Sequence, residues 1–134
     1  MNLKPIALAL TLVAAPASAI ALPPLQDNPR VVAEFFAAAV GDEIRKNCPT
    51  ISARMFRVLG RAKDLESYAL SLGYTDDDID AMRGDEAAKA RLKAQRDAYL
   101  AQNGVTPGDA DSYCRLGRQE IEKNTLTGWL LRAN

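Results

Sequence analysis

The stretch that decides the fold runs from Asn28 to Pro49 and reads NPRVVAEFFAAAVGDEIRKNCP. Asn28 is a good helix N-cap, and Pro29 suits the first helical position, where a backbone N–H would have no partner. Cys48-Pro49 ends the helix at about Asn47, because proline cannot continue it. Between these ends apolar residues recur at steps of three and four, which predicts one buried helical face made of Val32, Phe35, Phe36, Ala39, Val40 and Ile44.

The rest of the chain carries the same helical periodicity. It predicts further helices at Thr50–Leu72, Thr75–Arg83 and Glu86–Gln102, and a last long helix that Asp109 or Asp111 caps. No segment alternates β-branched and polar residues over a sustained length, so we expect no sheet. The predicted fold class is therefore all-α, a small bundle of four to five helices.

The second predicted helix carries an apolar stripe that we expect to be buried in the bundle. The stripe consists of Ile51, Met55, Val58, Leu59, Ala62, Leu65, Ala69 and Leu72. Gly60 interrupts this helix at a cost of about 1 kcal/mol relative to alanine. We therefore expect a kink or a close helix crossing at Gly60.

The N-terminus has the pattern of a signal peptide. Lys4 supplies a positive charge, and an apolar run follows at Ile6–Ala15. The run is too short to cross a membrane as a helix, which takes about 20 residues. Ala17-Ser18-Ala19 then offers the small side chains that a signal peptidase accepts. We predict cleavage after Ala19, with Ala21 as the second choice.

The predicted cleavage divides the chain into three parts. Residues 1–19 form the signal peptide, residues 20–29 an extended lead-in, and residues 30–134 a helical domain. The lead-in is expected to be extended because the two prolines of Leu22-Pro23-Pro24-Leu25 restrict the backbone. An exported chain of this kind is expected in the periplasm or secreted, with no membrane attachment after cleavage.

The charge of the mature chain is almost balanced. Cleavage removes Lys4, so the basic residues number one fewer than the 17 acidic ones. Such a balance produces no long-range field that would attract nucleic acid or anionic lipid. The sequence therefore excludes nucleic acid as a partner and leaves another periplasmic protein as the expected one, with the oligomeric state open.

Two cysteines, Cys48 and Cys114, favour a disulfide in an exported chain, because that compartment is oxidising. They lie 66 positions apart, and closing such a loop contributes about 4 kcal/mol in the chain-entropy model. The bridge would join the corner between the first two helices to the last long helix. The alternative, a redox-active pair, lacks the C-x-x-C spacing.

The chain contains no histidine, which removes the commonest general base and the commonest zinc ligand. No glycine-rich phosphate loop is present either, so we predict no cofactor and no enzymatic activity. A carboxylate pair is the one remaining catalytic alternative, and the candidates are expected on solvated helix faces: Glu34, Glu43, Glu66, Glu120 and Glu122.

An acidic cluster opens the third predicted helix. Asp76, Asp78 and Asp80 match the first ligands of a calcium loop. The match fails afterwards, because Ala81 stands where the loop needs glycine and Ala87 where it needs glutamate. Helix capping explains the aspartates without a metal, so no metal site is predicted.

A basic row on the second predicted helix is the strongest candidate binding feature. Arg54, Arg57 and Arg61 recur at helical steps, so they share one face. A solvated face is one interpretation, and a docking strip for an acidic partner is the other. A second basic stretch lies on the fourth helix, at Lys89, Arg91, Lys93 and Arg96.

The C-terminal tail carries the only tryptophan, Trp129, beside Leu126, Leu130 and Leu131. These residues are expected to pack over the bundle and close its core, because apolar residues at helical spacing are usually buried. An exposed patch is the alternative, and it would mark a partner site.

Several segments spread over the mature chain resemble a family of small exported proteins, the domain of unknown function numbered 5333, from alphaproteobacteria of the Rhodobacter group. The resemblance is carried by Leu22-Pro23-Pro24-Leu25, Asp42–Cys48, Ile51–Arg54, Leu72-Gly73-Tyr74, Asp76–Asp80, Ala98-Tyr99-Leu100, Cys114–Arg118 and Glu120-Ile121. It implies the helical fold and the exported address. The family has no established activity, so the resemblance adds no catalytic residue.

The sequence therefore predicts a non-catalytic periplasmic interaction or accessory protein. A small periplasmic acid-stress chaperone is the first alternative, because protonated carboxylates would leave a cationic, loosened bundle. An enzyme with a carboxylate pair is the least supported alternative.

Overall fold

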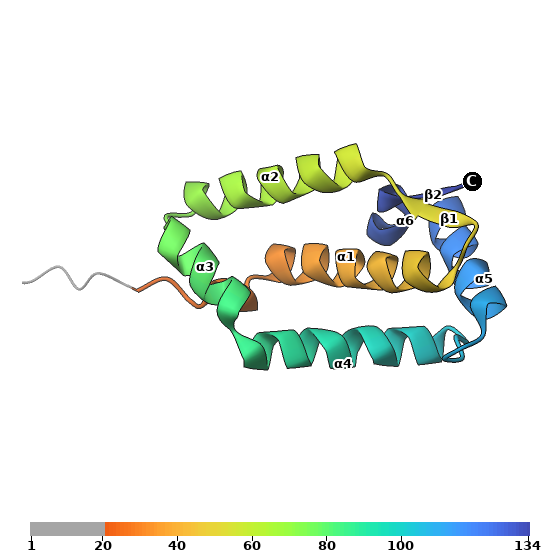
Figure 1. Ribbon diagram of the computed structural model, residues 1–134. Coiled ribbons are helices and arrows are strands. Elements are labelled where there is room, and N and C mark those ends of the chain that lie inside the picture. The colour runs from red at the N-terminus through yellow and green to blue at the C-terminus, as the bar shows by residue number, and fades with distance from the viewer. Residues whose placement is uncertain (1–20) are drawn as a thin grey trace, which may run out of the picture.

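A computed structural model describes residues 21–134 of the chain (Figure 1). Within that range it contains six α-helices, one short 3₁₀ helix and two short strands. In chain order they are η1 (Leu25–Asp27), α1 (Pro29–Asn47), β1 (Ile51–Ala53), α2 (Met55–Ser71), α3 (Asp76–Gly84), α4 (Glu86–Gln102), α5 (Ala110–Glu122), α6 (Leu126–Leu130) and β2 (Leu131–Ala133).

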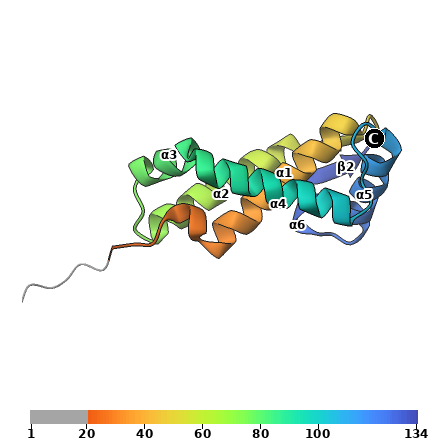
Figure 2. The same ribbon diagram turned by 90° about the horizontal axis from the view of Figure 1, so that it is seen from below.

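Helix α1 is the central element of the fold. Figure 1 shows α2 along one side of α1 and α4 along the other, with α3 joining them, so that the three helices form a U around its N-terminal half. At the other end α5, α6 and the two strands surround its C-terminal half. The view from below in Figure 2 shows α4 in front of α1 and crossing it obliquely.

The main core lies around the C-terminal half of α1. Val40 and Ile44 from α1 pack there with Leu116 of α5 and Leu131 of β2, and all four are almost fully buried. Cys48 and Cys114 lie in the same cluster and form the predicted disulfide, with 5.1 Å between their Cα atoms. The disulfide prediction is therefore confirmed, and the bridge joins the end of α1 to α5.

A second, smaller cluster closes the other end of the molecule. Leu25, Val31, Ala69, Tyr74 and Ile79 are buried together there. The Tyr74 hydroxyl also donates a hydrogen bond of 2.7 Å to the carbonyl oxygen of Pro23. This cluster holds the bend between α2 and α3 against the start of α1.

The expectation of no sheet is wrong. Ile51–Ala53, predicted as the start of the second helix, is strand β1, and it pairs antiparallel with β2, where Ile51 faces Ala133. The backbone N–H of Arg54 continues the contact with the carbonyl of Leu130 at 2.8 Å. Three residues are too short for an alternating pattern, and their partner lies at the far end of the chain.

The predicted count of four to five helices is also too low for the described residues, because the tail adds α6. Thr125 caps this five-residue helix by accepting a hydrogen bond from the N–H of Gly128. Leu130 and Leu131 are buried. The tail therefore packs on the core, as expected, and does not form a wholly exposed patch. Leu126 remains 42% exposed.

The predicted lead-in is partly helical. Leu25–Asp27 forms η1, and α1 begins at Pro29, inside the range expected to be extended. Burial of Leu25 in the smaller cluster accounts for the 3₁₀ turn. The predicted signal peptide, residues 1–19, lies outside the described residues. No helix within residues 21–134 is both long enough and apolar enough to span a membrane.

Other boundaries agree with the sequence prediction. Helix α1 ends at Asn47 and α4 spans Glu86–Gln102 as expected. Thr75 caps α3 in a capping box with Asp78. Of the two proposed caps for α5, Asp109 is the one whose side chain caps the helix.

Candidate functional site

Helix α2 is far more exposed than its apolar stripe predicts. Met55 is 55% exposed, Leu59 62% and Leu72 41%, so the expectation of a fully buried stripe is wrong. In α2 only Ala69 is fully buried. Gly60 lies at no close helix crossing, because a Cβ built there meets no atom within 4 Å.

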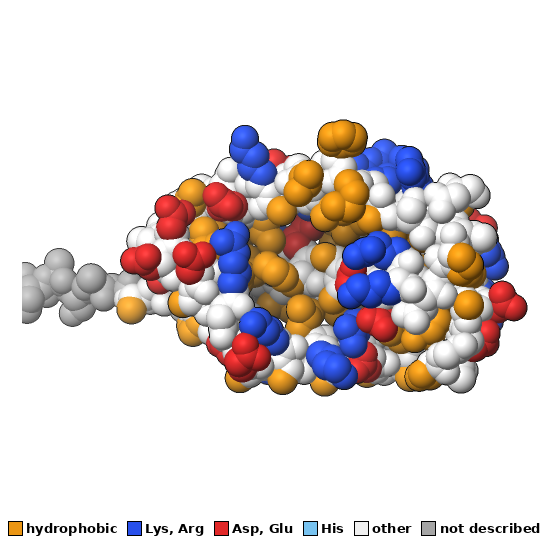
Figure 3. Space-filling model, viewed as in Figure 1, with side chains coloured by type: hydrophobic (Ala, Val, Ile, Leu, Met, Phe, Trp, Pro, Cys, Tyr) orange, Lys and Arg blue, Asp and Glu red, His pale blue; other side chains and the backbone are white. Residues whose placement is uncertain are grey.

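The outward side of α2 carries an apolar group among cations, which we call the outer patch. Its apolar members are Met55, Phe56 and Leu59, and Phe56 is 94% exposed. The sequence from Arg54 to Lys63 contains no acidic residue. The space-filling view in Figure 3 shows apolar and basic side chains side by side along this edge of the molecule.

Phe56 was not among the residues predicted for a site, because it lies beside the apolar stripe and not on it. The available signal was its position between Arg54 and Arg57. An aromatic residue at the edge of an apolar stripe, next to basic residues, is a candidate for an exposed apolar side chain.

The basic row of α2 contacts the C-terminal segment of the same chain. Arg54 donates through Nε to the carbonyl of Leu131 at 2.9 Å, and Arg57 donates to the carbonyl of Trp129 at 3.0 Å. The guanidinium of Arg57 also lies 4.8 Å from the centre of the half-buried Trp129 ring. These two arginines therefore attach the start of α2 to α6 and β2.

The third arginine of the row, Arg61, makes a bidentate ion pair with Glu34 of α1. Its Nε lies 3.0 Å from one carboxylate oxygen, and a terminal nitrogen lies 2.7 Å from the other. The Glu34 side chain is only 9% exposed, so its expected place on a solvated face is wrong. The hydrogen bond to Glu34 raises the pKa of Arg61 above its usual value.

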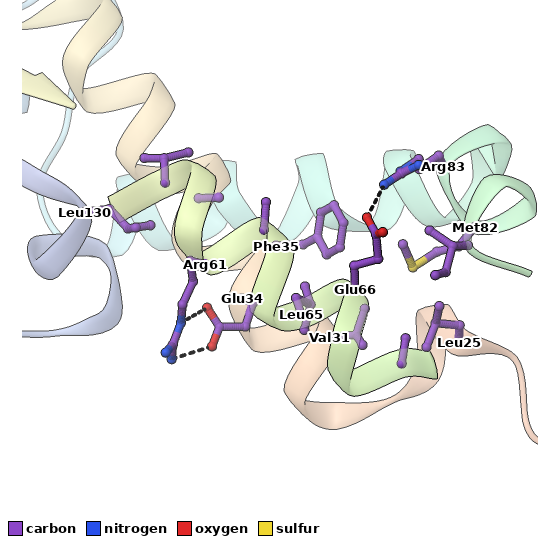
Figure 4. A pocket seen from close by; sticks show the side chains of 15 residues that line it. Leu25, Val31, Glu34, Phe35, Arg61, Leu65, Glu66, Met82, Arg83 and Leu130 are labelled. Carbon is purple, nitrogen blue, oxygen red and sulfur yellow. Dashed lines mark hydrogen bonds and ion pairs between the residues drawn. The ribbon is translucent and has the colours of Figure 1, made fainter. Parts of the chain in front are cut away.

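An apolar chamber lies beneath α2, next to this ion pair. Its volume is about 150 Å³. Helices α1, α2 and α3 contribute most of its wall, including Val31, Phe35, Val58, Leu65, Ile79 and Met82. Figure 4 shows Phe35 and Leu65 between two ion pairs, Glu34–Arg61 and Glu66–Arg83, with Met82 and Leu25 beyond the second pair.

A second chamber of about 400 Å³ adjoins the first on the other side of α1. The two share Val31, Phe35, Met82 and Arg83 in their walls, and together we call them the basin. The second chamber is bounded by α4 through Ala88, Leu92 and Gln95. Figure 3 shows one hollow in this face, with an apolar floor and basic side chains at its rim.

The basic rim belongs to the second chamber. Arg83, Lys89 and Arg91 line it together with one acidic residue, Asp27. Lys89 pairs with Glu86 at 2.8 Å and Arg91 with Asp27 at 3.5 Å, and Arg83 pairs with Asp80 at 3.1 Å. All three cationic side chains are more than half exposed. Exposed pairs of this kind are worth little, so they are easily exchanged for another anion.

Glu120 is the second glutamate that the sequence misplaced on a solvated face. It is 4% exposed, and its two oxygens accept hydrogen bonds from the hydroxyls of Tyr99 and Thr125. Burial, together with the hydrogen bond to Glu120, raises the pKa of Tyr99 to about 12. Glu120 therefore has a structural role between α4, α5 and the start of α6.

The acidic cluster of α3 has local partners. Asp78 and Thr75 form the capping box, and Asp80 pairs with Arg83. Hydrogen bonds from Thr75 lower the pKa of Asp78. Helix capping therefore explains the position of Asp78, and an ion pair on the same helix explains that of Asp80.

The fold and its site describe a small, mostly helical protein with one disulfide, an exposed apolar helix side and an apolar basin. The model of a family of unknown function, DUF5333, matches residues 23–132. The chain therefore belongs to this family, as the sequence resemblance indicated. Comparison with curated proteins and with solved structures found no match.

Proposed function

We propose that this protein is a non-catalytic interaction protein that binds an acidic, amphipathic segment of another protein on the outer patch of α2. The observation that carries the proposal is the 94% exposure of Phe56, next to the exposed side chains of Met55 and Leu59. Contiguous exposed apolar side chains mark interaction sites, and aromatic residues contribute most to binding at such sites.

The charge around the outer patch favours an acidic partner. Arg54 and Arg57 donate to carbonyl oxygens, and within residues 21–134 neither forms an ion pair with a carboxylate. Lys63 adds a third positive charge on the same helix. A partner segment with apolar residues and flanking Asp or Glu would cover the apolar side chains and complement these charges.

We also propose that the protein is exported to the periplasm or secreted. The supports are the signal-peptide pattern before Ala19 and the disulfide, which suits an oxidising compartment. The resemblance to the family further suggests an origin in alphaproteobacteria. Mass spectrometry of the mature protein tests the address: we expect it to begin at Ile20, and an intact Met1 in the cell envelope fraction would contradict cleavage.

Site-specific photocrosslinking in intact cells tests the binding site. A photoreactive amino acid replaces Phe56 in one variant and the exposed Ala101 of α4 in the control. We expect a discrete protein adduct from position 56 only, and its loss when Lys63→Glu is added. The adduct peptide should contain acidic residues. Equal adducts from both positions, or none at position 56, would overturn the proposal.

A small acid-stress chaperone is the second candidate, and the Glu34–Arg61 pair is the observation that favours it. This pair joins α2 to α1, and Asp64 is the other carboxylate acting on Arg61. Loss of this ion pair would weaken the attachment of α2 and expose the apolar side chains beneath it, as in a loosened acid state.

Client aggregation assays test the chaperone candidate. The wild-type protein should suppress aggregation at about pH 3 but not at about pH 7, because model carboxyl groups titrate near pH 4. Glu34→Gln should suppress aggregation at neutral pH as well. A wild-type protein that stays inert toward clients in acid would exclude this candidate.

A further inference from the structure

We propose that the basin is a binding site for a single-chain amphiphile with an anionic head, such as a fatty acid. The apolar chain would lie in the chamber between α1 and α2, and the head would lie at the basic rim of the chamber beside α4. This site is separate from the outer patch, because the basin uses the inward side of α2 and the outer patch the outward side.

The inner chamber suits an apolar chain. Its wall is formed mainly by aliphatic side chains and Phe35, and its volume is about 150 Å³. An apolar chain lying against such a wall would remove apolar surface from water on both sides. At one end Glu34 and Arg61 form a short bidentate ion pair, whereas the Glu66–Arg83 pair at the other end is long, at 3.8 Å, and exposed. The chamber therefore offers a ligand apolar contact and little else.

The two chambers of the basin together are large enough for an extended small molecule. The second chamber adds about 400 Å³ and meets the first at Val31, Phe35 and Met82. Small-molecule sites in proteins typically measure about 300–1,000 Å³. A flexible chain can pass from one chamber to the other along these shared residues.

The rim of the second chamber suits an anion. Arg83, Lys89 and Arg91 line this rim with Asp27, and each of the three cations is paired with an exposed carboxylate. The pairs these cations make are exposed, and the Arg83–Glu66 and Arg91–Asp27 pairs are long, at 3.8 and 3.5 Å. A carboxylate or phosphate head can replace such partners at small cost and gain charge-assisted hydrogen bonds.

Calorimetric titration with matched probes tests the proposal, each kept below its micellar concentration. Dodecanoate and dodecyl phosphate carry anionic heads, dodecanol has a neutral head, and dodecylamine is cationic at neutral pH. We expect the anions to bind at least about tenfold more tightly than dodecanol, the order of one charge-assisted hydrogen bond. Binding of either anion supports the proposal. Equal affinity for dodecanol, or tighter binding of dodecylamine, would overturn it.

Variants locate the two ends of the ligand. Arg83→Gln with Arg91→Gln should lower the affinity for dodecanoate about tenfold and leave that for dodecanol unchanged. Ala62→Phe should fill the inner chamber and abolish binding of both, with helicity and melting temperature checked by circular dichroism. Phe56→Ser should change neither. Undiminished dodecanoate binding by a folded Ala62→Phe variant would contradict the proposed site, whatever the outcome for the outer patch.

Discussion

At the scale of single residues, Gly128 occupies a position with no room for a side chain. A Cβ built there falls well inside contact distance of the Glu120 carbonyl group, which is backbone and cannot rotate away. We expect Gly128→Ala to lower the free energy of unfolding by about 3 kcal/mol, the upper end of the usual cost of overpacking. Urea denaturation measures the difference.

Gly60→Ala is the matched control for that experiment. Gly60 is helical, and a Cβ there meets nothing within 4 Å. Alanine in an unobstructed helix position should stabilise the protein by about 0.5–1 kcal/mol. A loss of stability in this variant would contradict the open surroundings of Gly60.

Tyr99 provides a residue-scale prediction about alkaline pH. Its pKa in the folded protein is about 12, whereas an unfolded tyrosine titrates near about pH 10. Because the folded pKa is raised, this stabilisation is fully present below about pH 10 and is lost as the pH rises through about 12. Tyr99→Phe should therefore lose less stability than the wild-type protein between about pH 8 and about pH 11.

The same variant tests the hydrogen bond at neutral pH. Tyr99→Phe removes one of the two donors to the buried Glu120, and an unmet buried acceptor costs about 1–3 kcal/mol. Chemical denaturation at pH 7 measures this loss. Unchanged stability at pH 7, or identical pH dependence of the two proteins, would show that the pair has no energetic role.

The burial of Glu34 and Glu120 could not be predicted from the local sequence pattern. A glutamate at a helical position has the same local pattern whether it meets water or a partner. The partners of these two, Arg61 and Tyr99, come from other helices. Only the packing of those helices decides which carboxylates are buried.

At the scale of elements, the disulfide holds the end of α1 to α5. Cys48→Ser with Cys114→Ser should lower the free energy of unfolding by about 2–4 kcal/mol, mainly because the unfolded chain gains freedom. Adding reductant to the wild-type protein should lower its melting temperature by as much as the two substitutions do. Mass spectrometry that finds two free thiols in protein isolated from the cell envelope would contradict the structural role.

The attachment of α2 to α1 gives a second element-scale prediction. Glu34→Gln leaves Arg61 beside a neutral side chain, so amides of α2 should exchange with solvent faster than in the wild-type protein. Asp97→Asn is the control, because the exposed Asp97 pairs with Lys93 and Arg96 on its own helix and such pairs contribute little. Equal effects of both changes on α2 would contradict the proposed attachment.

The elements themselves were predictable to different degrees. Helices α1, α3 and α4 carry their own caps and stops, so the sequence predicts their bounds within one or two residues. The two strands consist of three residues each and depend on each other across the whole domain. Local patterns carry no signal for such a pairing.

At the scale of the whole molecule, the protein has a tightly packed end and an open end. The packed end contains the disulfide and the main core, whereas the open end contains the basin inside the U of α2, α3 and α4. The basin could not be predicted from the sequence, because four helices contribute to it. The basic row was predicted by spacing, but its contacts with Trp129 and Leu131 depend on the C-terminal fold.

Hydrogen exchange on the complex decides whether the outward side of α2 is the binding surface. The partner captured at position 56 is added to the purified protein, and exchange is compared with and without it. We predict slower exchange in the segment Met55–Lys63 and little change in α4 and α5. Protection confined to α4 or α5, with Met55–Lys63 unchanged, would contradict the claim.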